Sequence, residues 1–339
     1  MEWFADYALF LAKAVTFLVV VFLVVAMLAS LKQRSKREEG TLSVVRLNDQ
    51  HARMTERLAD VVLDKAAVKA LHKTRKAEAK AREKNTEPGK RVYVLNFHGD
   101  IKASALSSLR QEVTAVLALA TAKDEIVVKL ESGGGMVHAY GLAASQLTRI
   151  REAGVPLTVC VDKVAASGGY MMACIADRVL AAPFAMLGSI GVVAQLPNFN
   201  RLLKKHDIDY EMLTAGEYKR TLTLFGENTE KGREKFQDDL ENIHRLFKTF
   251  VGQYRPGLDL AEVATGEVWF GMEAQEKGLA DQITTSDQYI SGLIRDAAVF
   301  EVHYATRKRL QDKLSAGASA TLDRLLLTWV SRFNNQRFW

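Results

Sequence analysis

Apolar runs and helical repeats alternate along the middle of the chain. Short apolar runs at residues 91–97, 125–131 and 156–161 predict buried strands. The segments between them, near residues 104–120 and 136–153, carry apolar residues at helical spacing. Strands that alternate with helices are typical of βαβ units, so we predict an α/β fold with a mostly parallel sheet.

Two later segments need a choice between interpretations. Residues 179–196 are apolar enough to suggest a membrane span, but Pro183, Gly188 and Gly191 interrupt the run. We therefore interpret it as core strands and turns, followed by a long helix near residues 229–253. The tail carries apolar residues at helical spacing, which suits subunit or membrane contact, or a packed terminal helix. These residues are Leu322, Leu325, Leu326 and Trp329.

The N-terminal segment has the composition of a membrane anchor. Residues 14–31 contain no charge, and extending the run back to residue 8 adds only Lys13, which can snorkel to the interface. A spanning helix needs about 20 such residues. The acidic residues Glu2 and Asp6 argue against a cleaved signal peptide, which begins with basic residues. We predict a short segment over residues 1–7 and a transmembrane helix over 8–31.

The region that follows the anchor is basic and partly helical. Residues 32–90 hold 16 Lys or Arg against 9 Asp or Glu, and helical spacing continues until residues 86–89 break it. Such a segment lies on anionic lipid headgroups or packs against a neighbouring subunit, unless it is a solvated linker. Because no nucleic-acid-binding motif accompanies the charge, no nucleic-acid partner is expected. The positive charges place the bulk of the protein in the cytoplasm.

Composition sets the scale of the remaining chain. The 339 residues are 48% hydrophobic, enough for one large α/β domain, which we place at residues 91–300 before a helical tail at 301–339. Cys160 and Cys174 lie in apolar contexts and predict buried free thiols rather than a disulfide. The seven histidines are scattered, without metal-ligand spacing. We therefore expect no metal, no cofactor and no catalytic histidine.

A serine between a predicted strand and a predicted helix carries the candidate chemistry. Ser167 lies in an Ala-Ala-Ser-Gly-Gly-Tyr segment, and Lys219 follows 52 positions later. A lysine amine can take the proton of a serine hydroxyl, so the pair suggests a hydrolase with a Ser-Lys dyad. The alternative interpretations are that Ser167 only caps the helix and that Lys219 is a solvated surface lysine.

A glycine turn lies upstream of that serine. Gly133, Gly134 and Gly135 follow the predicted strand at residues 125–131. Without side chains, such a turn can aim backbone N–H groups at an oxyanion, although it is also typical of an ordinary flexible turn.

Five motifs in order resemble the S49 peptidase family, which includes signal peptide peptidase A. They are found at residues 132–135, 166–170, 188–192, 216–219 and 266–281. The resemblance covers about residues 92–290, and the basic, anchored N-terminal region is similar to a branch of inner-membrane proteases. It implies a ClpP/crotonase-like spiral of ββα units and a homo-oligomer.

The resemblance also implies roles for individual residues. Ser167 would be the nucleophile and Lys219 the general base. Because burial disfavours the charged amine, we expect Lys219 to be buried when the site is assembled. Ser189 matches a position whose hydroxyl orients the lysine, with a locally bonded turn hydroxyl as the alternative.

The oxyanion hole implied by the resemblance consists of backbone N–H groups. One belongs to Gly168, and the other to Gly135 or Gly134. Gly133 stands where the family turn has proline. Glycine leaves a loop freer than proline does, so we expect a less preorganised oxyanion hole.

Three functional hypotheses follow. The first is a membrane-anchored serine endopeptidase of the bacterial inner membrane that cleaves peptides or unfolded proteins, such as signal-peptide remnants or misfolded membrane and envelope proteins. The family includes members with a periplasmic catalytic domain, in contrast to the cytoplasmic side that the charges favour. The second is a crotonase-like acyl-CoA enzyme, which leaves the Ser167/Lys219 pair unexplained. The third is a non-catalytic membrane scaffold, in which Lys219 would stay in solvent, far from Ser167, in every assembled state.

Overall fold

A computed structural model describes residues 16, 40–84 and 89–305. The predicted anchor at residues 8–31 lies outside the described residues except for Thr16, and so does the predicted tail beyond residue 305. Within the described residues, no helix is long and apolar enough to cross a membrane. The fold below is that of the compact unit Leu42–Tyr304.

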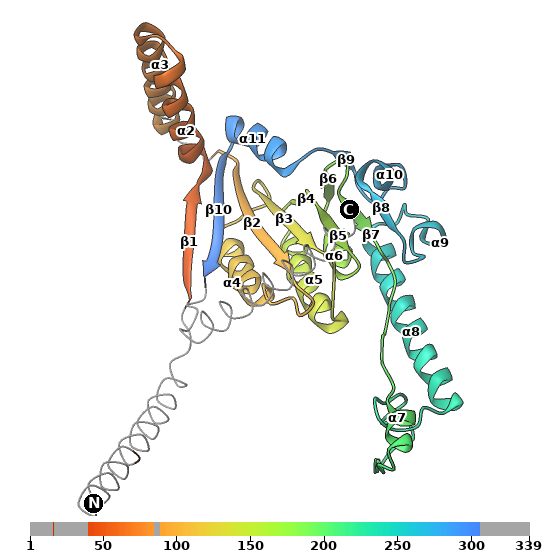
Figure 1. Cartoon of the computed structure of the whole chain (residues 1–339). Coiled ribbons are helices and arrows are strands. Elements are labelled where there is room, and N and C mark those ends of the chain that lie inside the picture. The colour runs from red at the N-terminus through yellow and green to blue at the C-terminus, as the bar shows by residue number, and fades with distance from the viewer. Residues whose placement is uncertain (1–15, 17–39, 85–88, 306–339) are drawn as a thin grey trace, which may run out of the picture. The chain divides into compact units, whose positions relative to one another are not determined.

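The described residues form a ten-stranded sheet (Figure 1). Its main path is β1-β10-β2-β3-β4-β6-β9, and β5, β7 and β8 branch from it. The strands are β1 (Thr41–Arg46), β2 (Arg91–Gly99), β3 (Glu125–Ser132), β4 (Leu157–Val161), β5 (Val164–Ala166), β6 (Arg178–Ala181), β7 (Met186–Gly188), β8 (Val268–Phe270), β9 (Gln282–Ile283) and β10 (Ala298–Ala305). Strands β2, β3, β4 and β6 pair in parallel, and β7 and β8 pair antiparallel.

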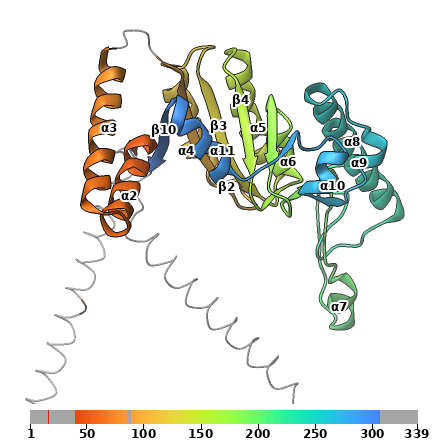
Figure 2. The same ribbon diagram turned by 90° about the horizontal axis from the view of Figure 1, so that it is seen from above.

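Helices cover both faces of the sheet (Figure 2). They are α2 (Leu47–Val62), α3 (Lys65–Lys84), α4 (Leu106–Leu117), α5 (Val137–Glu152), α6 (Gly168–Ala173), α7 (Asn200–Lys205), α8 (Glu230–Tyr254), α9 (Leu260–Val263), α10 (Gly271–Glu276) and α11 (Ser286–Asp296). The predicted α/β fold is confirmed, and α4, α5 and α8 lie where the spacing predicts helices.

Alternation along β2 shows how the core is divided. Leu95 and Phe97 point into the cluster formed with α4, α5 and α6, whereas Val92 and Val94 pack toward α11. Successive side chains of a strand point to opposite faces, so a strand covered on both sides must be apolar throughout. This double coverage explains the unbroken apolar stretches at residues 92–95 and 126–128.

Strand β3 divides between two partners, and this fork positions the candidate site. Its residues Ile126–Lys129 pair with β4, whereas its last residue, Ser132, pairs with Ala165 of β5. Strand β5 pairs in turn with β7. The ends of β3, β5 and β7 are therefore neighbours, although they are far apart in the sequence.

An arm at residues 192–229 separates β7 from α8. Figures 1 and 2 both place its helix, α7, away from the strands. The arm has packing of its own, because the Phe225 ring lies 6.1 Å from that of Phe199 and 5.9 Å from that of Tyr210. It nevertheless exposes large apolar side chains, among them Leu213 at 94% and Val193 at 80%. Such exposure in a folded segment suits a contact with another molecule.

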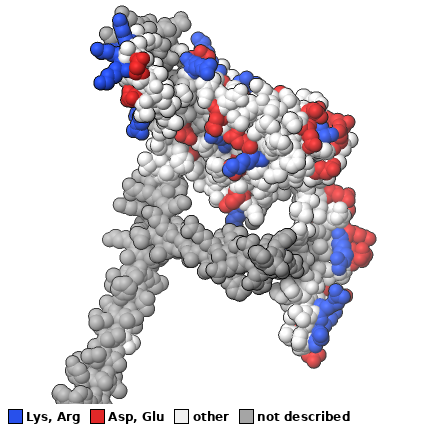
Figure 3. All heavy atoms as spheres, turned by 45° about the horizontal axis from the view of Figure 1, so that its top comes forward, with Lys and Arg blue, Asp and Glu red and all other residues white. Residues whose placement is uncertain are grey.

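The region at residues 32–90 is helical where the spacing predicts it. Helix α2 exposes Met54 and Leu58, and α3 exposes Lys69 and Lys73. Figure 3 shows Lys and Arg side chains gathered on the described part of these two helices. Strand β1 also lies in this region and was not predicted, and β10 runs past the predicted domain boundary at residue 300. Both follow from tertiary pairing, since β10 joins β1 to β2.

Candidate active site

Ser167 lies at the junction of β5 and α6, as the sequence predicts. Its backbone has φ 52° and ψ −119°, a conformation that a residue with a side chain adopts only under constraint. The constraint is visible: the Ser167 N–H donates to the Gly188 carbonyl at 2.8 Å. Ser167 is the N-cap residue of α6, but its side chain makes no capping hydrogen bond, so capping does not account for the hydroxyl.

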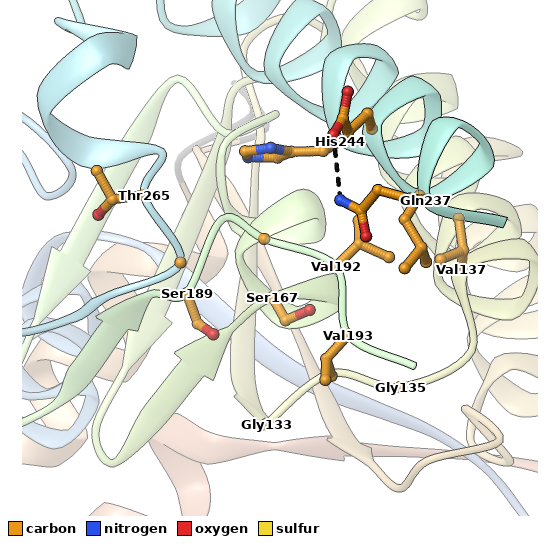
Figure 4. Close-up of a pocket in the computed structure, with 15 residues that line it drawn as sticks. Gly133, Gly135, Val137, Ser167, Ser189, Val192, Val193, Gln237, His244 and Thr265 are labelled. Carbon is orange, nitrogen blue, oxygen red and sulfur yellow. Dashed lines mark hydrogen bonds between the residues drawn. The ribbon is translucent and has the colours of Figure 1, made fainter. Parts of the chain in front are cut away.

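Ser189 occupies the equivalent position on the neighbouring strand. Ala166 pairs with Gly188, so the two serines follow paired residues of parallel strands. Ser189 has φ 48°, and its N–H donates to the Glu267 carbonyl at 2.6 Å. Within the described part of the chain neither serine hydroxyl has a hydrogen-bond partner, so both are available to another group. Figure 4 shows both side chains at the same pocket.

The glycine turn closes against the same junction. Gly134 has φ 88°, and a Cβ there would lie 2.7 Å from the Gly168 nitrogen and 2.7 Å from the Ser167 Cβ. Only glycine fits this close approach. The Gly134 N–H donates to the Ser132 Oγ at 3.1 Å. Among the described residues, the N–H groups of Gly135 and Gly168 have no such acceptor, so they are the free donors beside the Ser167 hydroxyl.

A pocket of about 700 Å³ opens over Ser167 (Figure 4). The glycine turn and the segment after Ser189 line one side, and α8 lines the other with Gln237, Leu240, Glu241 and His244. A second cavity, of about 260 Å³, also reaches Ser167. Its walls are largely apolar and include Met171, Ile243, Phe247 and Phe250. The hydroxyl therefore meets an open space with both polar and apolar walls, and an apolar recess.

His244 lines the pocket, although no motif in the sequence indicates that it does. Its Nε2 lies 3.0 Å from the Ile190 carbonyl and 3.0 Å from the Ala264 carbonyl. Two carbonyls can only accept, so Nε2 carries the proton and donates. His244 therefore ties α8 to the segment after β7 and does not present Nε2 as a base.

Lys219 does not line the pocket in the single chain. It is exposed, so the burial expected of the assembled site is not found within one chain. Its neighbour Glu217 pairs with Lys231 at 2.6 Å, and the Tyr218 ring lies 6.0 Å from the Lys231 amine. Leu240, on the pocket side of α8, follows Lys231 by nine residues, about two and a half helical turns. The segment that carries Lys219 therefore lies on the side of α8 turned away from the pocket.

The remaining predicted residues are structural. Tyr170 is fully buried and its hydroxyl donates to the Leu279 carbonyl at 3.1 Å, as expected of a packing residue. Cys160 and Cys174 are buried free thiols, as predicted, and burial raises the pKa of each to about 12. Among the described residues, no group of three His, Cys, Asp or Glu side chains could hold a metal ion.

Comparisons with known proteins agree with the motifs. Residues 2–147 match the model for the peptidase family S49 N-terminal region, and residues 149–300 match the model for peptidase family S49. The probable protease SohB of Haemophilus influenzae is 47% identical over 324 residues, which cover 92% of each chain. The probable protease SohB of Buchnera aphidicola subsp. Acyrthosiphon pisum is 42% identical over 96% of this chain and 97% of its own.

Solved structures show a weaker likeness. A membrane-bound, stomatin-specific protease called 1510-N has a TM-score of 0.41 and 13% identity, over 60% of this chain and 85% of its own. ClpP1 from Listeria monocytogenes has a TM-score of 0.36 and 12% identity, over 59% of this chain and 93% of its own. The two family matches and the relatives of nearly full length are decisive, and they show that the chain belongs to peptidase family S49.

Proposed function

We propose that this chain is a serine endopeptidase in which Ser167 is the nucleophile and Lys219 the general base. The observation that carries the proposal is the strained Ser167, whose unbonded hydroxyl faces a pocket beside the free N–H groups of Gly135 and Gly168. Strain at a single non-glycine residue is typical of functional sites. The forked sheet supports the ClpP/crotonase-like spiral expected from the family resemblance.

The reaction is acyl transfer in two steps. The Ser167 Oγ attacks the peptide carbonyl carbon while the Lys219 amine takes the hydroxyl proton. The N–H groups of Gly135 and Gly168 stabilise the tetrahedral oxyanion, and the leaving amine takes the proton from Lys219. Water then attacks the acyl-enzyme while the Lys219 amine takes a proton from it, and the same proton returns to the Ser167 Oγ as the acid product leaves. Ser189, beside Ser167, accepts a hydrogen bond from the lysine and orients it.

The lysine reaches the serine of another copy of the chain. Three observations support this: Lys219 is exposed, its neighbours bind the far side of α8, and the arm that carries it exposes apolar side chains. Burial of the arm against a second copy would also remove the amine from water, which a lysine base requires. The active form is therefore a homo-oligomer.

The substrates are extended peptides or unfolded protein segments. The pocket of about 700 Å³ and its apolar recess accept a chain with an apolar side chain, but not a folded domain. The predicted anchor at residues 8–31 would confine the enzyme to the bacterial inner membrane. Signal-peptide remnants and misfolded membrane proteins are both found at the membrane and offer unfolded segments with apolar side chains.

Covalent labelling tests the nucleophile. A fluorophosphonate probe should label the wild type at Ser167, and Ser167→Ala should lose both the label and hydrolysis of an unfolded peptide. Ser189→Ala keeps the nucleophile, so it should still be labelled at Ser167, although more slowly because the hydroxyl that orients Lys219 is lost. Unchanged labelling of Ser167→Ala would overturn the assignment.

Mixing two inactive variants tests whether copies share a site. Ser167→Ala and Lys219→Ala should each be inactive, whereas random co-assembly in equal amounts restores about a quarter of the sites. Activity that stays absent in a verified mixed oligomer would refute a shared site.

The exposure of Lys219 also favours a second candidate, the non-catalytic scaffold. That function predicts no labelling of the wild type and no hydrolysis in any oligomeric state.

A reporter fused after Trp339 would determine on which side of the membrane the catalytic domain lies. The positive charges after residue 31 favour the cytoplasmic side.

A further inference from the structure

A chain of hydrogen bonds lies beneath the glycine turn. The Gly134 N–H donates to the Ser132 Oγ at 3.1 Å, the Ser132 and Tyr140 hydroxyls are 2.5 Å apart, and the Tyr140 hydroxyl donates to the Asp100 carbonyl at 2.7 Å. Since Tyr140 has one proton and gives it to a carbonyl, Ser132 must donate to Tyr140. The bonds therefore run in one direction, from the turn to the end of β2.

The two hydroxyls are enclosed. Ser132 is 2% exposed and Tyr140 is fully buried. A Cβ on Gly99 would lie 2.4 Å from the Tyr140 hydroxyl and 2.5 Å from the Ser132 Oγ, and one on Gly168 would lie 2.4 Å from the Tyr140 ring. Because Gly99 and Gly168 have no side chains, Ser132 and Tyr140 occupy the space that a Cβ at either position would fill. Neither hydroxyl can turn to another partner without moving backbone.

This chain of bonds adds a hydrogen-bonded restraint to a turn that is otherwise held by close packing of Gly134 and Gly135. Gly133 is exposed and has nothing within 4 Å of its Cβ position, and it replaces the proline of the family turn. The N–H of Gly134 is consumed by Ser132, which leaves Gly135 as the donor that the turn can offer. The bond to Ser132 fixes the peptide plane between Gly133 and Gly134. The next plane, which holds the Gly135 N–H, is set relative to it by the backbone of Gly134, whose φ of 88° is held by close packing against Ser167 and Gly168.

We propose that Ser132 and Tyr140 are positioning residues that hold the glycine turn so that the Gly135 N–H points at the oxyanion. This inference rests on the proposed function of Ser167. The two residues touch neither the substrate nor the reacting atoms, and act only through the turn.

The expected effect is on turnover rather than on binding. An oxyanion donor acts on the transition state, so its misalignment lowers kcat and leaves KM nearly unchanged. Loss of a whole donor costs about 100- to 1,000-fold in kcat. Misalignment through Ser132→Ala should cost less, roughly 10- to 100-fold, with KM within about twofold of wild type.

The experiment compares full-length variants on an unfolded peptide. Ser132→Ala removes the acceptor of the Gly134 N–H, and Tyr140→Phe removes the next link while keeping the ring. Tyr170→Phe is the matched control, because it also deletes a buried tyrosine hydroxyl that donates to a backbone carbonyl, but one far from the turn. Kinetics, thermal unfolding and the rate of fluorophosphonate labelling at Ser167 are measured for each.

The first two variants should lower kcat and the labelling rate, Ser132→Ala more than Tyr140→Phe, while Tyr170→Phe should lower only the melting temperature. The double variant should be no slower than Ser132→Ala alone, because both changes break one chain of bonds. Wild-type kcat in Ser132→Ala, or an equal loss in Tyr170→Phe, would overturn the proposal. Failure of the wild type to label at Ser167 would instead refute the proposed function.

Discussion

Replacement of Gly134 by alanine tests the closeness of the glycine turn to the nucleophile. Gly134 has φ 88°, where an alanine costs about 1–2 kcal/mol. Its methyl group would lie 2.7 Å from the Ser167 Cβ, 2.7 Å from the Gly168 nitrogen and 2.8 Å from the Ala166 carbonyl oxygen. Ordinary contact begins at 3.4 Å, so the turn and the serine must separate by about 0.7 Å. Overpacking of this kind adds about 1–3 kcal/mol.

The expected total is roughly 2–5 kcal/mol of lost stability, or a fall in melting temperature of about 4–20 °C. Because a misplacement near 1 Å can cost about 100-fold in rate, peptide hydrolysis should fall by that order. Gly133→Ala is the control within the same turn: its φ is not positive and its Cβ position is empty, so both quantities should stay near wild type. A Gly134→Ala variant that matches Gly133→Ala in melting temperature and kcat would falsify the described packing.

Three further outcomes follow from single contacts. Burial opposes ionisation of Asp124, but hydrogen bonds from Arg91 and Thr121 prevail and lower its pKa from 3.8 to about 2. Its carboxylate therefore adds about 2 kcal/mol to the free energy of unfolding above pH 4, and this contribution is lost as the pH falls toward 2. Urea unfolding should show that Asp124→Asn is less stable than the wild type at pH 7, and that the difference in stability between the two becomes small in acid. His244→Ala should lower kcat without shifting the pH–rate profile, whereas a shifted profile would give the histidine a proton-transfer role. Ser189→Ala should lower kcat at least tenfold, because that is the contribution expected of a hydrogen bond between the Ser189 hydroxyl and the charged Lys219 amine. A kcat equal to that of the wild type would exclude this bond.

The sequence predicts the sheet best where strands are covered on both faces. The runs at residues 91–97 and 125–131 are largely apolar, with Asn96 and Lys129 as the polar residues inside them, because α4, α5 and α11 cover them. Strand β1, by contrast, exposes all six of its residues, so its apolar residues Leu42, Val44 and Val45 mark no buried face. Its existence depends on pairing with β10, which local pattern cannot reveal.

The candidate site is predicted in its components but not in its arrangement. Strand-to-helix and strand-to-turn junctions place Ser167 and Gly135 correctly, since both are local features. The neighbourhood of Ser167 and Ser189 depends on the register of β5 with β7, and the wall formed by His244 depends on how α8 packs. The position of Lys219 depends on an ion pair between Glu217 and Lys231. None of these tertiary contacts has a signature in residue type or spacing.

The fork in β3 also determines which parts of the site can move independently. The glycine turn, Ser167 and Ser189 all follow strands joined in one ladder, β3 to β5 to β7, so a displacement of one carries the others with it. Helix α8 is outside that ladder, and His244 fastens it by hydrogen bonds to two carbonyls. Because α8 also packs Phe247 and Val251 into the core, a shift of α8 that widened the pocket would have to break the His244 bonds and this packing. The width of the pocket and the position of Ser167 relative to the glycine turn are thus set by separate parts of the fold.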